Sequence, residues 1–131
     1  MNKKYELTSE TVNINGHILC RIKALRDFSN VKAGDLGGYI ESEYNLSHYG
    51  NCWIYNGRVY QNSRISGDAR VCRHVRIYGD IQICGDAWIC LGNYTHIRGD
   101  IKIDHGIWAQ SIAIDNKFYL LSSTLDKILV W

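Results

Sequence analysis

Apolar and polar residues alternate in short stretches that repeat every six positions through the middle of the chain. Residues 79–84 read GDIQIC and residues 85–90 read GDAWIC, so nearly the same phrase occurs twice in succession. The third residue of each unit is small or apolar, the fourth is large, and the fifth is β-branched and apolar. This alternation with a period of two predicts a short strand. The Gly-Asp pair that opens the unit predicts a turn.

The six-residue unit recurs from residue 50 to residue 115. Two units lack one residue, at 56–60 and 105–109, and Leu91 and Gly92 interrupt the series. The alternative fold is a meander of antiparallel hairpins, whose strands usually have about 5–6 residues and variable loops. Units this short and this regular favour a parallel β-solenoid. The fifth positions, which we expect to face its interior, are Ile54, Val59, Ile65, Val71, Ile77, Ile83, Ile89, Ile97 and Ile103.

The spacing resembles that of hexapeptide-repeat proteins. In that family an aliphatic residue recurs every six positions with a small residue four positions later, as Ile65 and Ala69 do here. The resemblance implies an all-β fold, a left-handed parallel β-helix of three to four coils over residues 44–116, with three units closing each coil. The spacing by itself predicts a parallel solenoid without giving its hand.

The N-terminal segment does not follow the repeat. Residues 11–14 and 17–22 flank the pair Asn15-Gly16, which predicts a β-hairpin with a type I′ turn. Residues 34–42 (GDLGGYIES) are expected to form an irregular first coil. Residues 1–43 are therefore predicted to cap the solenoid, because its first coil would otherwise expose unpaired strand edges.

The C-terminal segment, residues 117–131, is predicted to form two further strands. They fold back over the last coil as a cap, or they pair with a second copy of the chain in a dimer or trimer. Both alternatives stay open, because the tail is rich in large apolar residues that need a partner. The candidates for an oligomer contact are Phe118, Leu120, Leu129 and Trp131.

If three units close a coil, every third unit stacks on the same face, and the fourth positions form outward columns. The first column carries three tryptophans and an arginine. Tryptophan and arginine are the residue types that dominate protein-binding surfaces, so a partner-binding face is one hypothesis. The other is that a terminal segment covers the column as part of a cap. The residues concerned are Trp53, Arg70, Trp88 and Trp108.

A second outward column combines cations with neighbouring tyrosines. This combination suits phosphate groups, nucleotides or single-stranded nucleic acid. A solvated face is the favoured interpretation, however, because a net charge of +2 offers no wider basic field. Nucleic acid is therefore not expected as a partner. The candidate phosphate or nucleotide contacts are Arg58, Arg76, Tyr78 and His96.

Composition narrows the class of protein. The chain has 131 residues, a length typical of one domain. No segment approaches 18 apolar residues, and the start lacks the apolar run of a signal peptide, so we expect no membrane contact and a cytoplasmic location. The 5 cysteines are then expected to be free thiols, including Cys72 and Cys90, which should stack at one corner.

The hexapeptide-repeat family includes acyltransferases and γ-type carbonic anhydrases. Its acyltransferases usually add a long loop, a catalytic histidine at a trimer cleft and a C-terminal helix, which this sequence does not predict. His74 and His96 are the candidate bases, but neither has an orienting carboxylate in register. Converging histidines for zinc are not apparent either. We therefore expect no catalytic site, metal or cofactor, and acyl transfer is the runner-up.

The N-terminal half carries a second resemblance. Residues 4–11 (KYELTSET), 22–28 (IKALRDF) and 34–42 look like a group of phage and prophage proteins in which a similar head precedes the repeats. Phage origin implies a non-enzymatic protein that binds and blocks a host protein, such as a CRISPR effector or another defence component, in the cytoplasm of an infected or lysogenic bacterium. A sponge for nucleotide signals is a further alternative.

Overall fold

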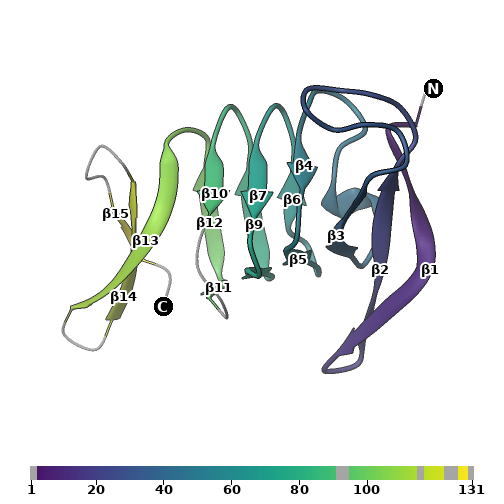
Figure 1. Ribbon diagram of the computed structural model, residues 1–131. Helices are drawn as coiled ribbons and strands as arrows, with labels where there is room; N and C mark the ends of the chain where they lie inside the picture. Colours follow the sequence, from purple (N-terminus) through teal and green to yellow (C-terminus); the bar gives the residue numbers. More distant parts are fainter. Residues whose placement is uncertain (1–2, 91–94, 115–116, 123–126, 130–131) are drawn as a thin grey trace.

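The computed structural model describes residues 3–90, 95–114, 117–122 and 127–129, and it is a parallel β-solenoid of about three coils (Figure 1). The strands form three faces. The first face contains β4 (Trp53–Ile54), β7 (Arg70–Cys72), β10 (Trp88–Cys90) and β13 (Ile107–Ile114). The second contains β3 (Leu36–Ile40), β5 (Arg58–Val59), β8 (Arg76–Ile77) and β11 (His96–Ile97). The third contains β6 (Arg64–Ile65), β9 (Asp80–Ile83) and β12 (Asp100–Ile103).

The interior of the solenoid is the aliphatic series predicted from the repeat. Every fifth-position residue from Ile54 to Ile97 has an exposed fraction of 0%, and Ile103 has 2%. Small or aliphatic third-position residues such as Ala69 and Ala87 are buried beside them. The predicted parallel solenoid and its inward positions are therefore confirmed. The left hand of the coil stays a prediction of the family resemblance.

The N-terminal end of the solenoid is closed by a hairpin. Strands β1 (Tyr5–Ile14) and β2 (His17–Ala24) pair antiparallel, and Asn15 and Gly16 between them have φ of 50° and 90°, as a type I′ turn requires. Strand β2 pairs antiparallel with β3, which in turn pairs parallel with β5. Strand β3 thus converts the antiparallel cap into the parallel stack, and residues 34–42 supply the irregular first coil expected of them.

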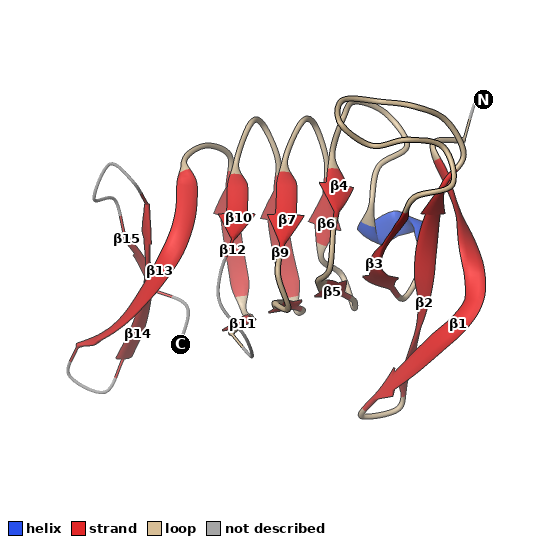
Figure 2. Cartoon of the chain, in the orientation of Figure 1, coloured by secondary structure: helices blue, strands red, loops and turns tan. Residues whose placement is uncertain are grey.

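A short 3-10 helix, η1 (Glu43–Asn45), follows β3 and leads into an isolated parallel bridge between Leu46 and Ile65 (Figure 2). The buried Asn45 amide completes this coil. Its Nδ2 donates to the carbonyl oxygens of Ser63 and Gln61, and its Oδ1 accepts from the backbone N–H of Ser42. No helix in the described ranges is long and apolar enough to cross a membrane.

The opposite end of the solenoid carries the C-terminal strands (Figure 1). Strand β13 pairs parallel with β10 and antiparallel with β14 (Lys117–Ser122), which pairs antiparallel with β15 (Lys127–Leu129). The predicted C-terminal strands are therefore present at Phe118, Leu120 and Leu129, although only their backbone is described. Trp131 lies outside the described residues. Their role in an oligomer contact stays a prediction.

Glycines stack along the corner between the third and first faces. Gly67 and Gly85 have φ of 65° and 61°, in the left-handed region that favours glycine. A Cβ on Gly85 would overlap the carbonyl oxygen of Asp104 in the next coil. The close approach of successive coils therefore requires glycine at this corner.

Substitution Gly85→Ala is expected to destabilise the fold by more than the roughly 1–2 kcal/mol that left-handed backbone alone costs. The excess arises because the added Cβ collides with backbone that cannot move without shifting the next coil. Gly99→Ala is the control, because Gly99 also has positive φ, at 105°, but nothing lies within 4 Å of its added Cβ. Urea unfolding of the two variants measures the difference, and equal losses of stability would contradict the steric explanation.

Candidate functional site

The first outward column has the predicted register in its first three members. Trp53 pairs with Arg70, and Arg70 pairs with Trp88. Trp53 is nevertheless only 1% exposed, because Phe28 packs against its ring with centroids 5.2 Å apart and Tyr5 lies edge-on at 6.4 Å. Trp53 therefore does not belong to an open partner-binding face. At this coil the alternative expectation holds, and the N-terminal segment covers the column.

The prediction that Trp108 points outward is wrong. Trp88 pairs with Ile107, and Ile89 pairs with Trp108, so Trp108 occupies an inward position. It is 2% exposed, and its Nε1 donates to the carbonyl oxygen of His105 at 2.7 Å. The physical reason is a shift of one residue, which exchanges the two sides of a strand. The unit 105–109 lacks its first residue, which would form the corner. Asp104, the last residue of the unit 99–104, takes that corner position as well.

The exposed part of this face includes Arg70, Cys72, Trp88 and Ile107, and we name these four residues the Trp88 surface. Trp88 is 40% exposed and its register partner Ile107 is 45% exposed. Trp88 Nε1 donates to Cys72 Sγ at 2.7 Å, and the Arg70 guanidinium lies 5.9 Å from the indole centroid. Arg70 Nη2 also donates to Ser29 Oγ at 2.8 Å. These contacts hold both large side chains in place.

The Cys72 thiol of the Trp88 surface is not activated. Cys72 and Cys90 are register partners and both are free, as predicted. Burial, with a further contribution from Cys90, raises the pKa of the Cys72 thiol to about 11, and the hydrogen bond from Trp88 opposes this shift. A thiol with so high a pKa stays protonated near neutral pH, so Cys72 lacks the thiolate that a nucleophile needs.

The second outward column also has the predicted register and extends into the cap. Its members, which we name the cross-strand row, are Arg21, Tyr39, Arg58, Arg76 and His96. The Arg58 guanidinium stacks over the Tyr39 ring at 5.0 Å. Arg21 Nη1 lies 3.1 Å from Glu10 Oε2, and Tyr39 Oη donates to the same carboxylate. The structure thus brings together the predicted residues Arg58, Arg76 and His96.

An aromatic ladder runs along the corner beside the row, from His17 through Tyr60 and Tyr78 to His96. Successive centroids are 5.4, 5.1 and 5.7 Å apart, and the two tyrosine rings are stacked. Tyr78 Oη lies 3.0 Å from His96 Nδ1. Burial and the cations of Arg76 and Arg98 lower the pKa of His96. His96 is therefore predominantly neutral at pH 7 and lies in a locally positive field.

Among the described residues, the side chains of His17, His48 and His105 each lie beside a carboxylate. His17 Nδ1 lies 2.7 Å from Glu41, and His48 Nε2 lies 2.8 Å from Glu43. The candidate base His96 faces a tyrosine hydroxyl instead. Within residues 3–90 and the other described ranges, no group of three or more His, Cys, Asp or Glu side chains could hold a metal ion.

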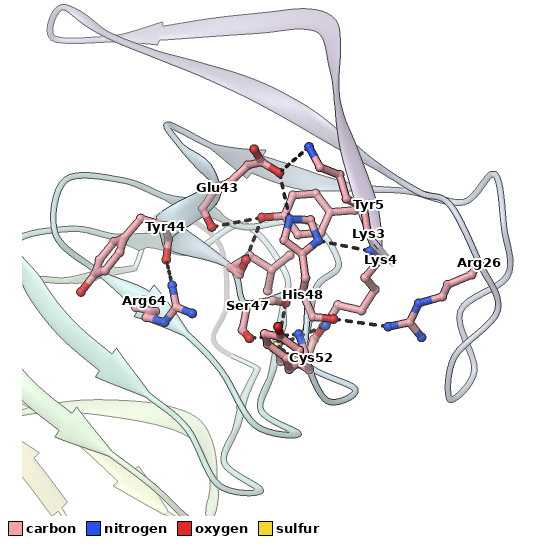
Figure 3. A network of polar contacts seen from close by, with 12 residues as sticks. Lys3, Lys4, Tyr5, Arg26, Glu43, Tyr44, Ser47, His48, Cys52 and Arg64 are labelled. Atoms are coloured by element: carbon pink, nitrogen blue, oxygen red, sulfur yellow. Dashed lines mark hydrogen bonds and ion pairs between the residues drawn. The ribbon is translucent and has the colours of Figure 1, made fainter. Parts of the chain in front are cut away.

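A cluster of polar contacts at the start of the N-terminal strand contains Lys4 (Figure 3). Lys4 is 0% exposed, and its Nζ donates to the carbonyl oxygens of Cys52 and Gly50 at 2.6 and 3.3 Å and to Cys52 Sγ at 3.3 Å. Three acceptors match the three N–H donors of an ammonium group. The Phe28 ring adds a cation–π contact at 5.0 Å. Burial lowers the pKa of Lys4, and the Cys52 side chain opposes that shift.

His48 joins this cluster to the first coil (Figure 3). Its ring stacks on Tyr5 with centroids 4.1 Å apart, and its Nδ1 accepts from the Lys4 backbone N–H at 3.1 Å. The proton is therefore on Nε2, which donates to Glu43. Because both ring nitrogens are engaged, His48 has no nitrogen free for base catalysis. The cluster fastens β1 to the solenoid, and sequence reasoning missed it because lysine is rarely buried.

No protein-family model matches the chain. Among curated proteins, it resembles the uncharacterized acetyltransferase YdcK of Escherichia coli (strain K12), with 43% identity over 53 residues. The match covers 39% of this chain and 16% of the Escherichia coli protein, so it concerns a small part of a longer relative. The likeness agrees with the repeat architecture.

Substitution Lys4→Met is expected to destabilise the protein by about 1–3 kcal/mol, because the buried carbonyl oxygen of Cys52 loses its donor. Lys3→Met is the matched control. Lys3 lies 3.4 Å from Glu43, but both side chains are about half exposed, at 54% and 46%, so its loss should cost about 0–1 kcal/mol. Urea unfolding at neutral pH measures both variants. Indistinguishable midpoints would show that the Lys4 cluster does not fasten the cap.

Proposed function

We propose that the chain is a non-enzymatic binding protein that docks on another protein through the Trp88 surface. Its resemblance to phage proteins makes a host factor, such as a defence component, the proposed partner. The observation that carries the proposal is the exposure of Trp88 beside Ile107 on a sheet face whose neighbouring tryptophans are buried. Two adjacent exposed apolar side chains, flanked by an arginine, have the composition of an interface centre.

The hydrogen bonding of Trp88 supports this proposal. Its indole N–H already donates to Cys72 Sγ, so a partner can cover the ring without leaving a buried donor unsatisfied. The ring is also held on one side by Arg70, which lowers the entropy lost on binding. Arg70 uses one donor for Ser29, and the rest of its guanidinium suits a carboxylate on the partner. An apolar patch with an adjacent acidic residue is the complementary surface.

Substitution Trp88→Ala is expected to weaken binding of a captured host protein by about 30-fold or more, since central tryptophans commonly contribute about 2 kcal/mol. Capture from bacterial lysate identifies the partner, and titration of the purified pair gives the Kd. Tyr49→Ala is the control, because Tyr49 is 71% exposed and lies outside the Trp88 surface. If Trp88→Ala and Tyr49→Ala bind equally well, the Trp88 surface is not the binding site.

Acyl transfer is a second candidate function, favoured by the likeness to a protein named an acetyltransferase. The geometry makes His17 a better base for it than His74 or His96. Glu41 lies 2.7 Å from His17 Nδ1 and orients the ring, which leaves Nε2 as the basic nitrogen. Nε2 has a long contact of 3.4 Å with the exposed Gln61 side chain, which an acceptor group can displace, unlike the backbone N–H that His48 Nδ1 accepts from. In such a reaction Nε2 takes the proton of an acceptor hydroxyl or amine, which attacks the thioester carbonyl. The coenzyme A thiolate then leaves and is protonated.

An enzyme of this kind would release free coenzyme A from acetyl-CoA in the presence of an amine or alcohol acceptor, and His17→Gln would slow release by about 100-fold or more. His74→Gln serves as the control, since His74 is exposed and has no carboxylate ion pair within the described ranges. Thiol release is followed with a chromogenic reagent. No release above the buffer rate, across several acceptors, would remove acyl transfer as a candidate.

A further inference from the structure

The cross-strand row places two like charges on neighbouring strands. Arg58 and Arg76 are direct partners in the ladder between β5 and β8, and neighbouring strands lie about 4.8 Å apart. Like charges directly opposite each other destabilise a sheet. Both side chains are half-buried, so solvent and salt screen the repulsion less well than on an open surface. The fold therefore carries a local cost that a bound anion would remove.

Carboxylates at the margin of the row are already engaged elsewhere. Glu10 accepts from Arg21 and Tyr39, and Glu41 is bound by His17 and by the backbone N–H of Gln61. In the part of the chain that the structure describes, neither Arg58 nor Arg76 forms an ion pair. At the hairpin end of the row, the charge of Arg21 is therefore neutralised by Glu10. Over β5 and β8, the charges of Arg58 and Arg76 have no carboxylate partner among the described residues.

The neighbouring aromatic rings indicate what kind of anion fits. Tyr78 stacks on Tyr60 and forms a T-shaped pair with His96. The Tyr39 ring is covered by the Arg58 guanidinium. Each of these rings already has a partner within the protein, which reduces the aromatic surface available to a nucleobase. The chemistry favours recognition of a charged group over recognition of a base.

We propose that Arg58 and Arg76 form a binding site for one phosphate or diphosphate group of a small molecule. A guanidinium presents a planar fork of N–H donors that matches phosphate oxygens. Stacking on Tyr39 holds the Arg58 fork in place, and the register of the two strands brings the Arg76 fork to the same side of the sheet. This site lies on a different face from the Trp88 surface, so neither proposal depends on the other.

The proposal makes a two-sided prediction for Arg76→Gln, measured by thermal unfolding at low ionic strength. Inorganic pyrophosphate should raise the unfolding midpoint of the unaltered protein more than sodium chloride does at equal ionic strength. Arg76→Gln should remove this increase and weaken pyrophosphate binding in calorimetry by about tenfold or more, because a charge-assisted contact is lost. Without phosphate, the same variant should unfold at an equal or higher temperature, because the repulsion is relieved.

Arg64→Gln is the matched control. Arg64 occupies the equivalent outward position on the third face and stacks on Tyr44 at 5.1 Å, as Arg58 stacks on Tyr39, but its register partner is Gln82. It should retain the pyrophosphate effect. The proposal is overturned if pyrophosphate acts no differently from chloride, if Arg76→Gln and Arg64→Gln respond alike, or if Arg76→Gln lowers the midpoint in the absence of phosphate.

A panel of probes distinguishes the sources of the phosphate group. Inorganic phosphate, pyrophosphate and a nucleoside diphosphate should all compete for the site. A single-stranded oligonucleotide should bind no more tightly per phosphate than pyrophosphate. Binding of the oligonucleotide alone would overturn the proposal in favour of a nucleic-acid surface.

Discussion

A coil of this solenoid can satisfy its backbone only by lying against another coil, and the rest of the structure depends on that constraint. Within the stack, each coil supplies the hydrogen-bond partners of the next. The backbone N–H of Trp53, for example, donates to the carbonyl oxygen of Ala69, and that of Arg70 donates to the carbonyl oxygen of Ala87. At the first coil there is no preceding repeat. The hairpin, the Asn45 amide and the Lys4 ammonium provide the missing partners, and the C-terminal strands β14 and β15 extend the sheet at the other end.

The same constraint determines which outward positions remain available for function. Trp53 belongs to the repeat, yet the cap uses it as part of its own core with Phe28 and Tyr5. The outward side chains of the coils between the two ends are not buried in a cap in this way. They include Arg70 and Trp88 on one face and Arg76 on another. Each proposed binding site is therefore centred on the middle coils, although Ile107 lies on β13 and Arg58 stacks on Tyr39 of the cap.

The repeat was sufficient to predict the faces and the interior as far as Ile103, because burial of a β-branched residue every six positions leaves one consistent register there. It could not predict that Trp53 is covered, since the covering residue Phe28 lies in a segment without periodicity. The orientation of Trp108 depended on whether the unit 105–109 lacks a residue at its start or at its end. Either register puts an apolar side chain in the interior, so the pattern alone could not decide between them. Gly106, in the small third position beneath Ala87, was the available clue. Lys4 left no clue at all.

The short unit at 105–109 has a consequence for how such a chain can change. Losing one residue at a corner reverses the side-chain alternation of the strand that follows, so that residues which faced the interior face solvent and the reverse. In this chain the residues after the corner suit the reversed alternation, with Ile107 outside and Trp108 inside. Length changes in this architecture therefore cannot spread freely. An insertion or deletion at a corner is tolerated only where the residues of the next strand are acceptable both in the interior and on the surface of the solenoid.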